Sequence, residues 1–163
     1  MQATATTELG TAELAADLYA LFVHLNKSCS ADLFAAMSEL ELSITQLKLL
    51  HQLELAGKEL TVKEAAESVL LSVAAVSRTV DDLVRRGIVE RHEDTEDRRM
   101  KRVGLTEAGR RAIRMVSEAR LAGLEQFARS LSDEERRALA PALEALMRRS
   151  DMASCRPDRS KAR

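Results

Sequence analysis

Arginines and small side chains between residues 72 and 102 are the residues whose types and spacing suggest a chemistry. One segment, residues 72–78, reads SVAAVSR, and another, residues 97–102, reads DRRMKR. Small side chains let a helix enter the major groove of DNA, where arginine can bond a guanine edge and alanine can touch a thymine methyl group. Arginine on a hairpin tip suits the narrow minor groove, where the potential is most negative. These types therefore predict contacts with a DNA duplex.

Two short helices are expected to position the first segment. Thr61 followed by Glu64 is a capping box that begins one helix, and Ser72 caps the next, which ends at Gly87. The inner face of the second helix is predicted from an apolar stripe: Val73, Val76, Val80, Leu83 and Val84. At 100° per residue, the side chains that remain on the outer face at the start of the helix, available to the groove, are those of Ser72, Ala74, Ala75, Ser77 and Arg78.

A hairpin is expected to present the second segment. Residues 88–91 and 101–105 have the pattern of two short strands, and residues 92–100 form a charged loop between them. Arg98, Arg99 and Lys101 are the residues of this hairpin predicted to contact DNA, and Asp97 could hold a neighbouring guanidinium. Because residues 72–102 hold eight basic and seven acidic side chains, non-specific DNA affinity should be modest.

The composition of the 163-residue chain excludes several classes of protein. A net charge of −1 means that any attraction to nucleic acid is local. The absence of a signal-like start or a long apolar run predicts a cytoplasmic protein that does not enter a membrane. Three separated histidines and two cysteines give no metal-ligand spacing, and no nucleophile, base and orienter are arranged for catalysis. We expect no cofactor, no metal and no enzymatic activity.

Long helices are expected on both sides of the hairpin unit. The predicted divisions are a dimerisation helix at 8–38, a winged helix-turn-helix at 43–105, dimerisation helices at 106–149 and a disordered basic tail at 150–163. Pro141 predicts a kink or break near Ala140 in the last helix. The fold class is mainly α with a small β-hairpin wing (α+β). The terminal helices hold more leucine than a small winged helix can cover, which predicts an interface.

Two further groups of residues suggest regulation. Phe22, Phe34, Met37 and His51 could line an effector pocket between helices, although plain core is the commoner role of such residues. Cys29 could sense oxidants if nearby charges stabilise its thiolate, whereas a buried, inert cysteine is the simpler interpretation.

The motifs resemble those of the multiple-antibiotic-resistance regulator (MarR) family of bacterial transcription factors over roughly residues 12–149. Three patterns carry the resemblance: Ser72-x-x-x-Val76-Ser77-Arg78, the run LVRRGIVER at 83–91, and Asp97-Arg98-Arg99-x-Lys101-x-x-x-Leu105-Thr106-x-x-Gly109. The resemblance implies a winged-helix homodimer whose two recognition helices read a palindromic operator. It also implies repression, often relieved by a small aromatic acid, which a phenolic compound would represent, or by thiol oxidation.

The sequence departs from the family pattern at three positions. Leu70 stands where a turn glycine is frequent, and Asp82 replaces a commonly basic residue. Tyr19 occupies the position of the peroxide-sensing cysteine, about ten residues before Cys29. The sequence therefore predicts a DNA-binding repressor released by a small effector. A winged-helix module that binds proteins without specific DNA binding, or a redox-sensing regulator acting through Cys29, are the alternatives.

Overall fold

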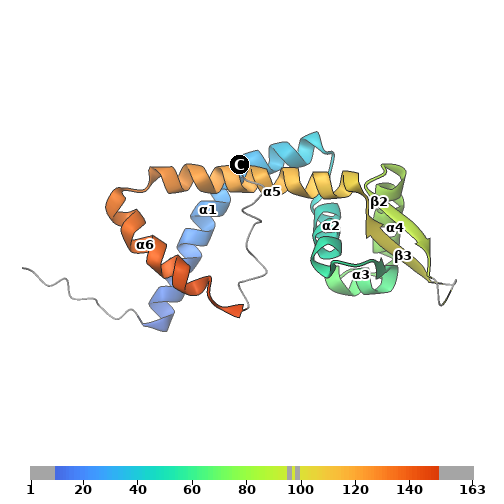
Figure 1. The fold of residues 1–163 in the computed structure, drawn as a ribbon, viewed down its shortest axis with the longest axis horizontal. Helices are drawn as coiled ribbons and strands as arrows, with labels where there is room; N and C mark the ends of the chain where they lie inside the picture. The colour runs from blue at the N-terminus through green and yellow to red at the C-terminus, as the bar shows by residue number, and fades with distance from the viewer. Residues whose placement is uncertain (1–9, 95–96, 98–99, 151–163) are drawn as a thin grey trace, which may run out of the picture. The chain divides into compact units, whose positions relative to one another are not determined.

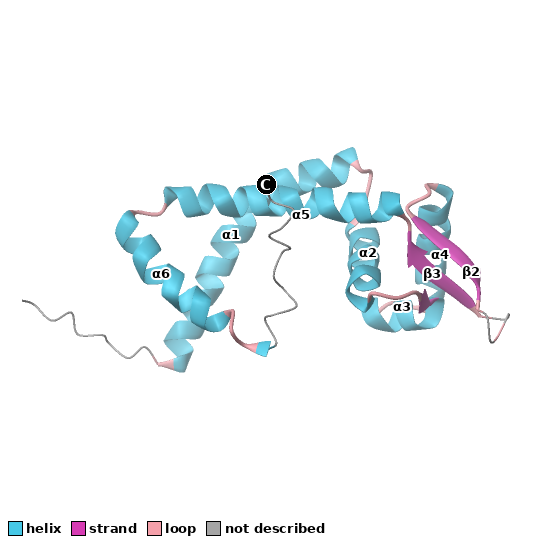
Figure 2. Cartoon of the chain, in the orientation of Figure 1, coloured by secondary structure: helices cyan, strands magenta, loops and turns pink. Residues whose placement is uncertain are grey.

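A computed structural model describes residues 10–94, 97 and 100–150 of the chain. It has the helices and strands shown in Figure 1 in the order α1 (Thr11–Glu39), α2 (Ile44–Ala56), β1 (Leu60–Thr61), α3 (Val62–Val69), α4 (Val73–Arg85), β2 (Val89–Glu93), β3 (Lys101–Leu105), α5 (Glu107–Ser130) and α6 (Asp133–Leu146). The predicted class, mainly helical with a small β wing, is confirmed (Figure 2). The chain divides after Gly123 into two compact units. The expected tail falls, from residue 151 on, outside the described residues.

Helix boundaries follow the capping residues of the sequence. Ser43, Thr61 and Ser132 each accept a hydrogen bond from the amide three residues later, and the Gln or Glu at that position bonds back to the cap amide. Gly57 and Gly87 have φ angles of 62° and 68°, in the left-handed region that ends a helix. Local hydrogen-bonding chemistry therefore fixes where these helices begin and end.

The strands form a three-stranded antiparallel sheet in the order β1-β3-β2. Val89 pairs with Leu105, and Leu60 pairs with Val103. The expected strand at 101–105 is confirmed, whereas the expected strand at 88–91 runs from 89 to 93. The two-residue strand β1 was not expected, because it has no alternation to detect and leads directly into the cap of α3.

The core of the first unit lies between α2, α3, α4, the sheet and the start of α5. Its fully buried side chains include Leu49, Leu50, Val76, Val80, Leu83, Val103 and Ile113. Leucine, valine and isoleucine fill this core, and the inner faces of α3, α4 and the sheet are fixed by it. In the described part of the chain, no helix could cross a bilayer.

Helix α6 differs from the expectation for its proline. Pro141 lies inside a helix that continues to Leu146, so the chain does not break near Ala140. The proline removes one backbone hydrogen bond. No residue of α6 is buried within the chain, so water can satisfy the carbonyl that loses its partner. The helix also ends earlier than the expected boundary at 149.

Candidate nucleic-acid interface

Helix α4 packs on the core along one face and is capped at its start. The Ser72 hydroxyl accepts a hydrogen bond from the amide of Ala75 at 3.2 Å. Val76, Val80 and Leu83 are fully or almost fully buried and fix the inner face of the helix. The rotation of α4 about its axis is therefore set by three aliphatic side chains in the core.

The predicted major-groove residues lie on the outer side of α4. Ser72, Ala74 and Arg78 are exposed, and Ala75 and Ser77 are partly exposed. Val73 was expected to be buried in the inner stripe of α4, but half of its surface is exposed. The first turn and a half of α4 thus presents small side chains, one aliphatic residue and one arginine.

Both acidic residues of α4 are engaged within the fold. Asp82 accepts a hydrogen bond from the Gln46 amide at 2.8 Å and another from the Arg85 guanidinium at 2.8 Å. Asp81 accepts a bond from Arg91 of β2 at 2.6 Å. Asp82, which stands where the family commonly has a basic residue, therefore connects α4 to α2. The pairs also neutralise charges that would otherwise repel or attract a duplex.

Arg78 differs from the other described cations between residues 72 and 102. Arg85, Arg91, Lys101 and Arg102 form ion pairs, and Arg86 donates to backbone carbonyls of the turn after α1. Arg78 has neither an ion pair nor a hydrogen bond to the described residues, and its side chain is exposed. Among the described cations of this segment, it alone needs to break no contact before it binds an external acceptor.

A buried carboxylate that the sequence interpretation missed organises the wing between β2 and β3. Asp94 is only 3% exposed and accepts hydrogen bonds from the Arg102 guanidinium and from the Asp97 amide. The Asp94 amide in turn donates to the Met100 carbonyl at 3.0 Å. An aspartate four residues before a predicted loop arginine, with another arginine eight residues later on the next strand, is the signal that could have found it.

Of the three wing residues predicted to contact DNA, Lys101 lies within the described residues. Arg98 and Arg99 lie outside the described residues. Lys101 is exposed at the start of β3 and donates to Glu93 across the hairpin at 2.8 Å. This hydrogen bond holds the pKa of the Glu93 carboxyl below its usual value. The base of the wing is thus a set of paired charges.

The start of α5 fixes the wing against the recognition helix. The Thr106 hydroxyl donates toward the Gly87 and Ile88 carbonyls at 2.7 and 2.9 Å, and accepts from the Gly109 amide at 3.1 Å. A Cβ atom on Gly109 would lie 2.2 Å from the Ile88 carbonyl oxygen. Glycine is therefore required here because α5 touches the backbone between α4 and β2.

The four expected effector residues do not share one environment. Phe22 and Phe34 are 61% and 54% exposed, whereas Met37 is buried beside Leu47. Twelve residues of helix separate the two phenylalanines, a rise of about 18 Å along α1. The Nε2 atom of His51 is buried and has no hydrogen-bond partner within the described part of the chain.

His51 lies in a partly buried position on α2. Burial lowers the pKa of its imidazole, as does the positive charge of Arg120, while Glu54 opposes the shift. The ring is therefore mainly neutral near pH 7. In this form one ring nitrogen donates a hydrogen bond and the other accepts one.

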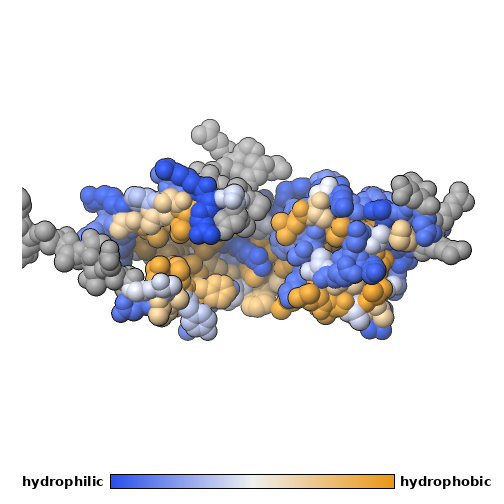
Figure 3. All heavy atoms as spheres, turned by 90° about the horizontal axis from the view of Figure 1, so that it is seen from below, coloured by the Kyte–Doolittle hydropathy of each residue, from blue (hydrophilic) through white to orange (hydrophobic). Residues whose placement is uncertain are grey.

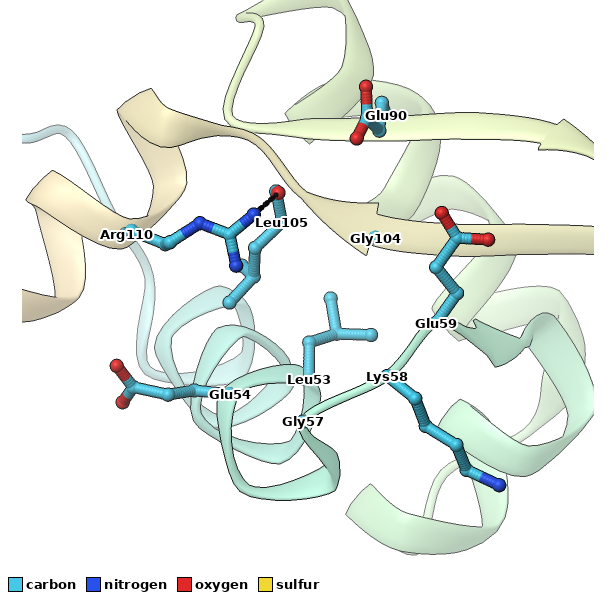
Figure 4. A pocket seen from close by; sticks show the side chains of 9 residues that line it. All are labelled: Leu53, Glu54, Gly57, Lys58, Glu59, Glu90, Gly104, Leu105 and Arg110. Carbon is cyan, nitrogen blue, oxygen red and sulfur yellow. Dashed lines mark hydrogen bonds between the residues drawn. The ribbon is translucent and has the colours of Figure 1, made fainter.

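A cavity of about 360 Å³ lies elsewhere, between the end of α2, the sheet and the start of α5 (Figure 4). Charged side chains surround it: Glu54, Lys58, Glu59, Glu90 and Arg110. The guanidinium of Arg110 is bonded to the Leu105 carbonyl at 2.9 Å. None of the expected effector residues lines this cavity, and its mixed charges do not suit an aromatic ligand.

Cys29 is buried against α5. A Cβ atom built on Gly123 would lie 2.9 Å from its Sγ atom, so the two helices are in close contact there. No group of three or more potential metal ligands occurs within residues 10–94, 97 and 100–150. The described chain thus contains neither an exposed thiol nor a ligand cluster.

Comparison with known proteins finds similarity to transcriptional regulators. Residues 40–100 match the model of the MarR family. A curated relative, the uncharacterized HTH-type transcriptional regulator YfiV of Bacillus subtilis, is 29% identical over 132 residues, which cover 81% of this chain and 82% of the relative.

Two solved structures show the same fold. A MarR family protein from Bacillus stearothermophilus is 26% identical with a TM-score of 0.63, and the match covers 85% of this chain and 96% of that one. A mutant of S. aureus MepR bound to an oligodeoxyribonucleotide is 21% identical with a TM-score of 0.66, covering 80% and 95% of the two chains. The region that matches the family model, residues 40–100, contains α2, β1, α3, α4 and β2.

Proposed function

The chain belongs to the MarR family of transcriptional regulators, a non-enzymatic class with a DNA-binding winged helix, and on this premise we propose that it is a homodimeric repressor of a palindromic operator. The recognition helix α4 would enter the major groove through Ser72, Ala74, Ala75, Ser77 and Arg78. Arg98 or Arg99 would reach the adjacent minor groove, and Lys101 would exchange Glu93 for a phosphate. Such a regulator would act in the cytoplasm, beside the chromosome.

This proposal rests on the exposed guanidinium of Arg78, which has no ion pair or hydrogen bond to the described residues. The exposed residues before it on α4 are small apart from Val73, so the backbone of α4 can approach the floor of a groove about 12 Å wide. Arginine bonded to both acceptors of a guanine edge contributes about 1 to 3 kcal/mol of discrimination. The other described cations near it are already paired, so the site provides one strong contact on a nearly neutral surface.

Two arginines of the same helix give a matched test. Arg78→Ala should weaken binding to DNA from the upstream region of its own gene by roughly 5- to 150-fold, the range that 1 to 3 kcal/mol represents. Arg85→Ala removes a guanidinium that is already bonded to Asp82 and should change the affinity less. Fluorescence anisotropy at two salt concentrations measures both. Equal affinity of wild type and Arg78→Ala would refute the assigned role.

The exposed apolar faces of the terminal helices support a homodimer. On α1 they are Leu14, Leu18, Tyr19, Leu21, Phe22 and Val23, and in the second unit Leu124, Leu143 and Leu146. Orange apolar patches interrupt the hydrophilic surface in Figure 3. Large exposed apolar surface in a folded chain usually marks an interface. Residues 8–38 and 106–149 would form the dimer, and the two recognition helices would read half-sites about one DNA turn apart.

Sedimentation equilibrium tests the dimer. Leu18→Glu and Phe22→Glu place charges on the exposed face of α1 and should shift the protein toward monomer, because an unpaired charge in an interface is strongly unfavourable. Leu55→Glu, on an exposed position of α2, is the control and should remain dimeric. A wild-type protein that sediments as a monomer at micromolar concentration would contradict the proposal.

We propose that a small aromatic acid, such as a phenolic acid, releases the repressor from DNA. The Nε2 of His51, which has no partner among the described residues, and the nearby charge of Arg120 would bind a carboxylate, and one aromatic side chain of α1 would contact the ring once a second copy covers it. Such a ligand would favour a spacing of the winged helices that no longer fits the operator.

Benzoate and salicylate, with cyclohexanecarboxylate as the non-aromatic control, test this release. The aromatic acids should lower the anisotropy of operator-bound protein, and His51→Ala should raise the required concentration. Release by all three acids to the same extent would argue for a general salt effect, and release by none would refute the effector proposal.

The alternative functions have weaker support. A protein-binding module would use Asp81 and Asp82, but both carboxylates are engaged by side chains of this chain. A thiol switch at Cys29 would require oxidants to reach a sulfur packed between α1 and α5.

A further inference from the structure

Val73 is an aliphatic residue on the DNA-facing end of α4 that its own chain does not cover. It is 50% exposed, whereas Val76 and Val80 of the same apolar stripe are 1% and 0% exposed. Val73 lies seven residues before Val80 and so has nearly the same angle around the helix. Val73 is therefore exposed because it lies at the start of the helix, and not because it points to a different side of the helix.

The direction of side chains on a helix explains this exposure. Each Cα–Cβ bond leans toward the N-terminus of its helix, so the side chain of the first helical residue extends beyond the first turn. Val73 is that residue, directly after the Ser72 cap. Its methyl groups therefore lie at the end of α4 that a major groove would receive, next to the exposed side chain of Ala74.

We propose that Val73 is a specificity-determining residue that recognises the C5-methyl group of a thymine in each half of the operator. The proposal rests on the proposed function, since it assumes that α4 enters the major groove. The thymine methyl is the apolar group that distinguishes an A·T pair on the major-groove edge. Valine suits this contact because its branched side chain has one preferred rotamer and loses little entropy on binding. Arg78, one and a half turns later, would read a guanine, so the two residues specify different bases.

Deoxyuridine substitution tests the contact directly. An operator duplex is first selected from random DNA by the full-length wild-type protein, and each thymine is then replaced by deoxyuridine, which removes the methyl group and keeps the base pair. At one thymine in each half-site, the replacement should weaken wild-type binding about fourfold, the change expected from one buried methyl group. Val73→Ala should bind the original operator more weakly and lose the sensitivity to that replacement.

Two control variants separate this contact from a general loss of apolar surface or of DNA affinity. Leu55→Ala removes another exposed aliphatic side chain, on α2, and should keep the full sensitivity to deoxyuridine. Arg78→Ala should also keep it, since the guanidinium reads a different base. Circular dichroism of Val73→Ala should match wild type, because the residue is half-exposed and outside the fully buried core.

The outcomes that overturn the inference are distinct from failure of the proposed function. If wild type selects a DNA sequence but no deoxyuridine replacement weakens binding, Val73 does not read a thymine. If the sensitivity persists unchanged in Val73→Ala, the methyl group is read by another residue, such as Ala74. If wild type selects no sequence at all, the regulator proposal fails, and the inference fails with it.

Discussion

Leu70 offers a test of the backbone strain in the turn between α3 and α4. It has φ 59° and ψ 45°, a left-handed conformation, and 89% of its surface is exposed. The turn requires this conformation, because the Leu70 amide donates to Glu67 and the Leu71 amide donates to Ala66 at the end of α3. The left-handed region disfavours a residue with a Cβ atom by about 1 to 2 kcal/mol.

Leu70→Gly should therefore stabilise the protein. Relief of the strain is offset by about 0.5 to 1 kcal/mol, because glycine has more freedom in the unfolded chain. Little burial is lost from so exposed a leucine, so the net gain should be about 0.5 to 1 kcal/mol. Leu70→Ala keeps the strain and loses the same exposed surface, so it should be no more stable than wild type.

Urea unfolding at one fixed protein concentration measures this series, because dimer stability depends on concentration. The glycine variant should have the highest midpoint and unchanged DNA affinity within about twofold, since the turn keeps its geometry. A glycine variant no more stable than the alanine variant would refute the assignment of strain to this turn.

Three further changes test other contacts. Gly109→Ala should lower the free energy of unfolding by about 2 kcal/mol or more, measured by urea denaturation, because the new methyl group meets a backbone carbonyl. Asp94→Asn should lower it by about 1 to 3 kcal/mol and speed hydrogen exchange in the wing loop, since the bond from Arg102 loses its charge partner. For His51, burial and Arg120 lower the folded pKa below 6.5, so the unfolded state binds a proton first as pH falls. Wild-type stability should therefore decline below about pH 6.5 until the folded pKa is reached, and His51→Gln should show a smaller decline; equal declines would contradict this.

Local chemistry explains what the sequence could predict. Ser72 and Thr61 could be recognised as helix caps because the hydroxyl and the amide that it bonds are three residues apart in the chain. Val80 and Leu83 follow from helical periodicity, since both lie well inside the length of α4. Interactions of this kind require no knowledge of the rest of the fold.

Long-range contacts explain what the sequence could not predict. The roles of Asp81 and Asp82 depend on β2 and α2, which only the folded chain brings to α4. Val73 fits the inner stripe by periodicity, yet the core does not extend as far as the first turn of the helix. Asp94 is buried because a strand eight residues later supplies its partner.

Helix α4 uses separate residues for folding and for its outer surface. Residues that hold the helix in the fold, such as Val76, Leu83 and Asp82, are different from those that face outward, such as Ala74 and Arg78. Substitutions at the outward residues would therefore change what α4 contacts while the folding stability of the chain stays nearly constant.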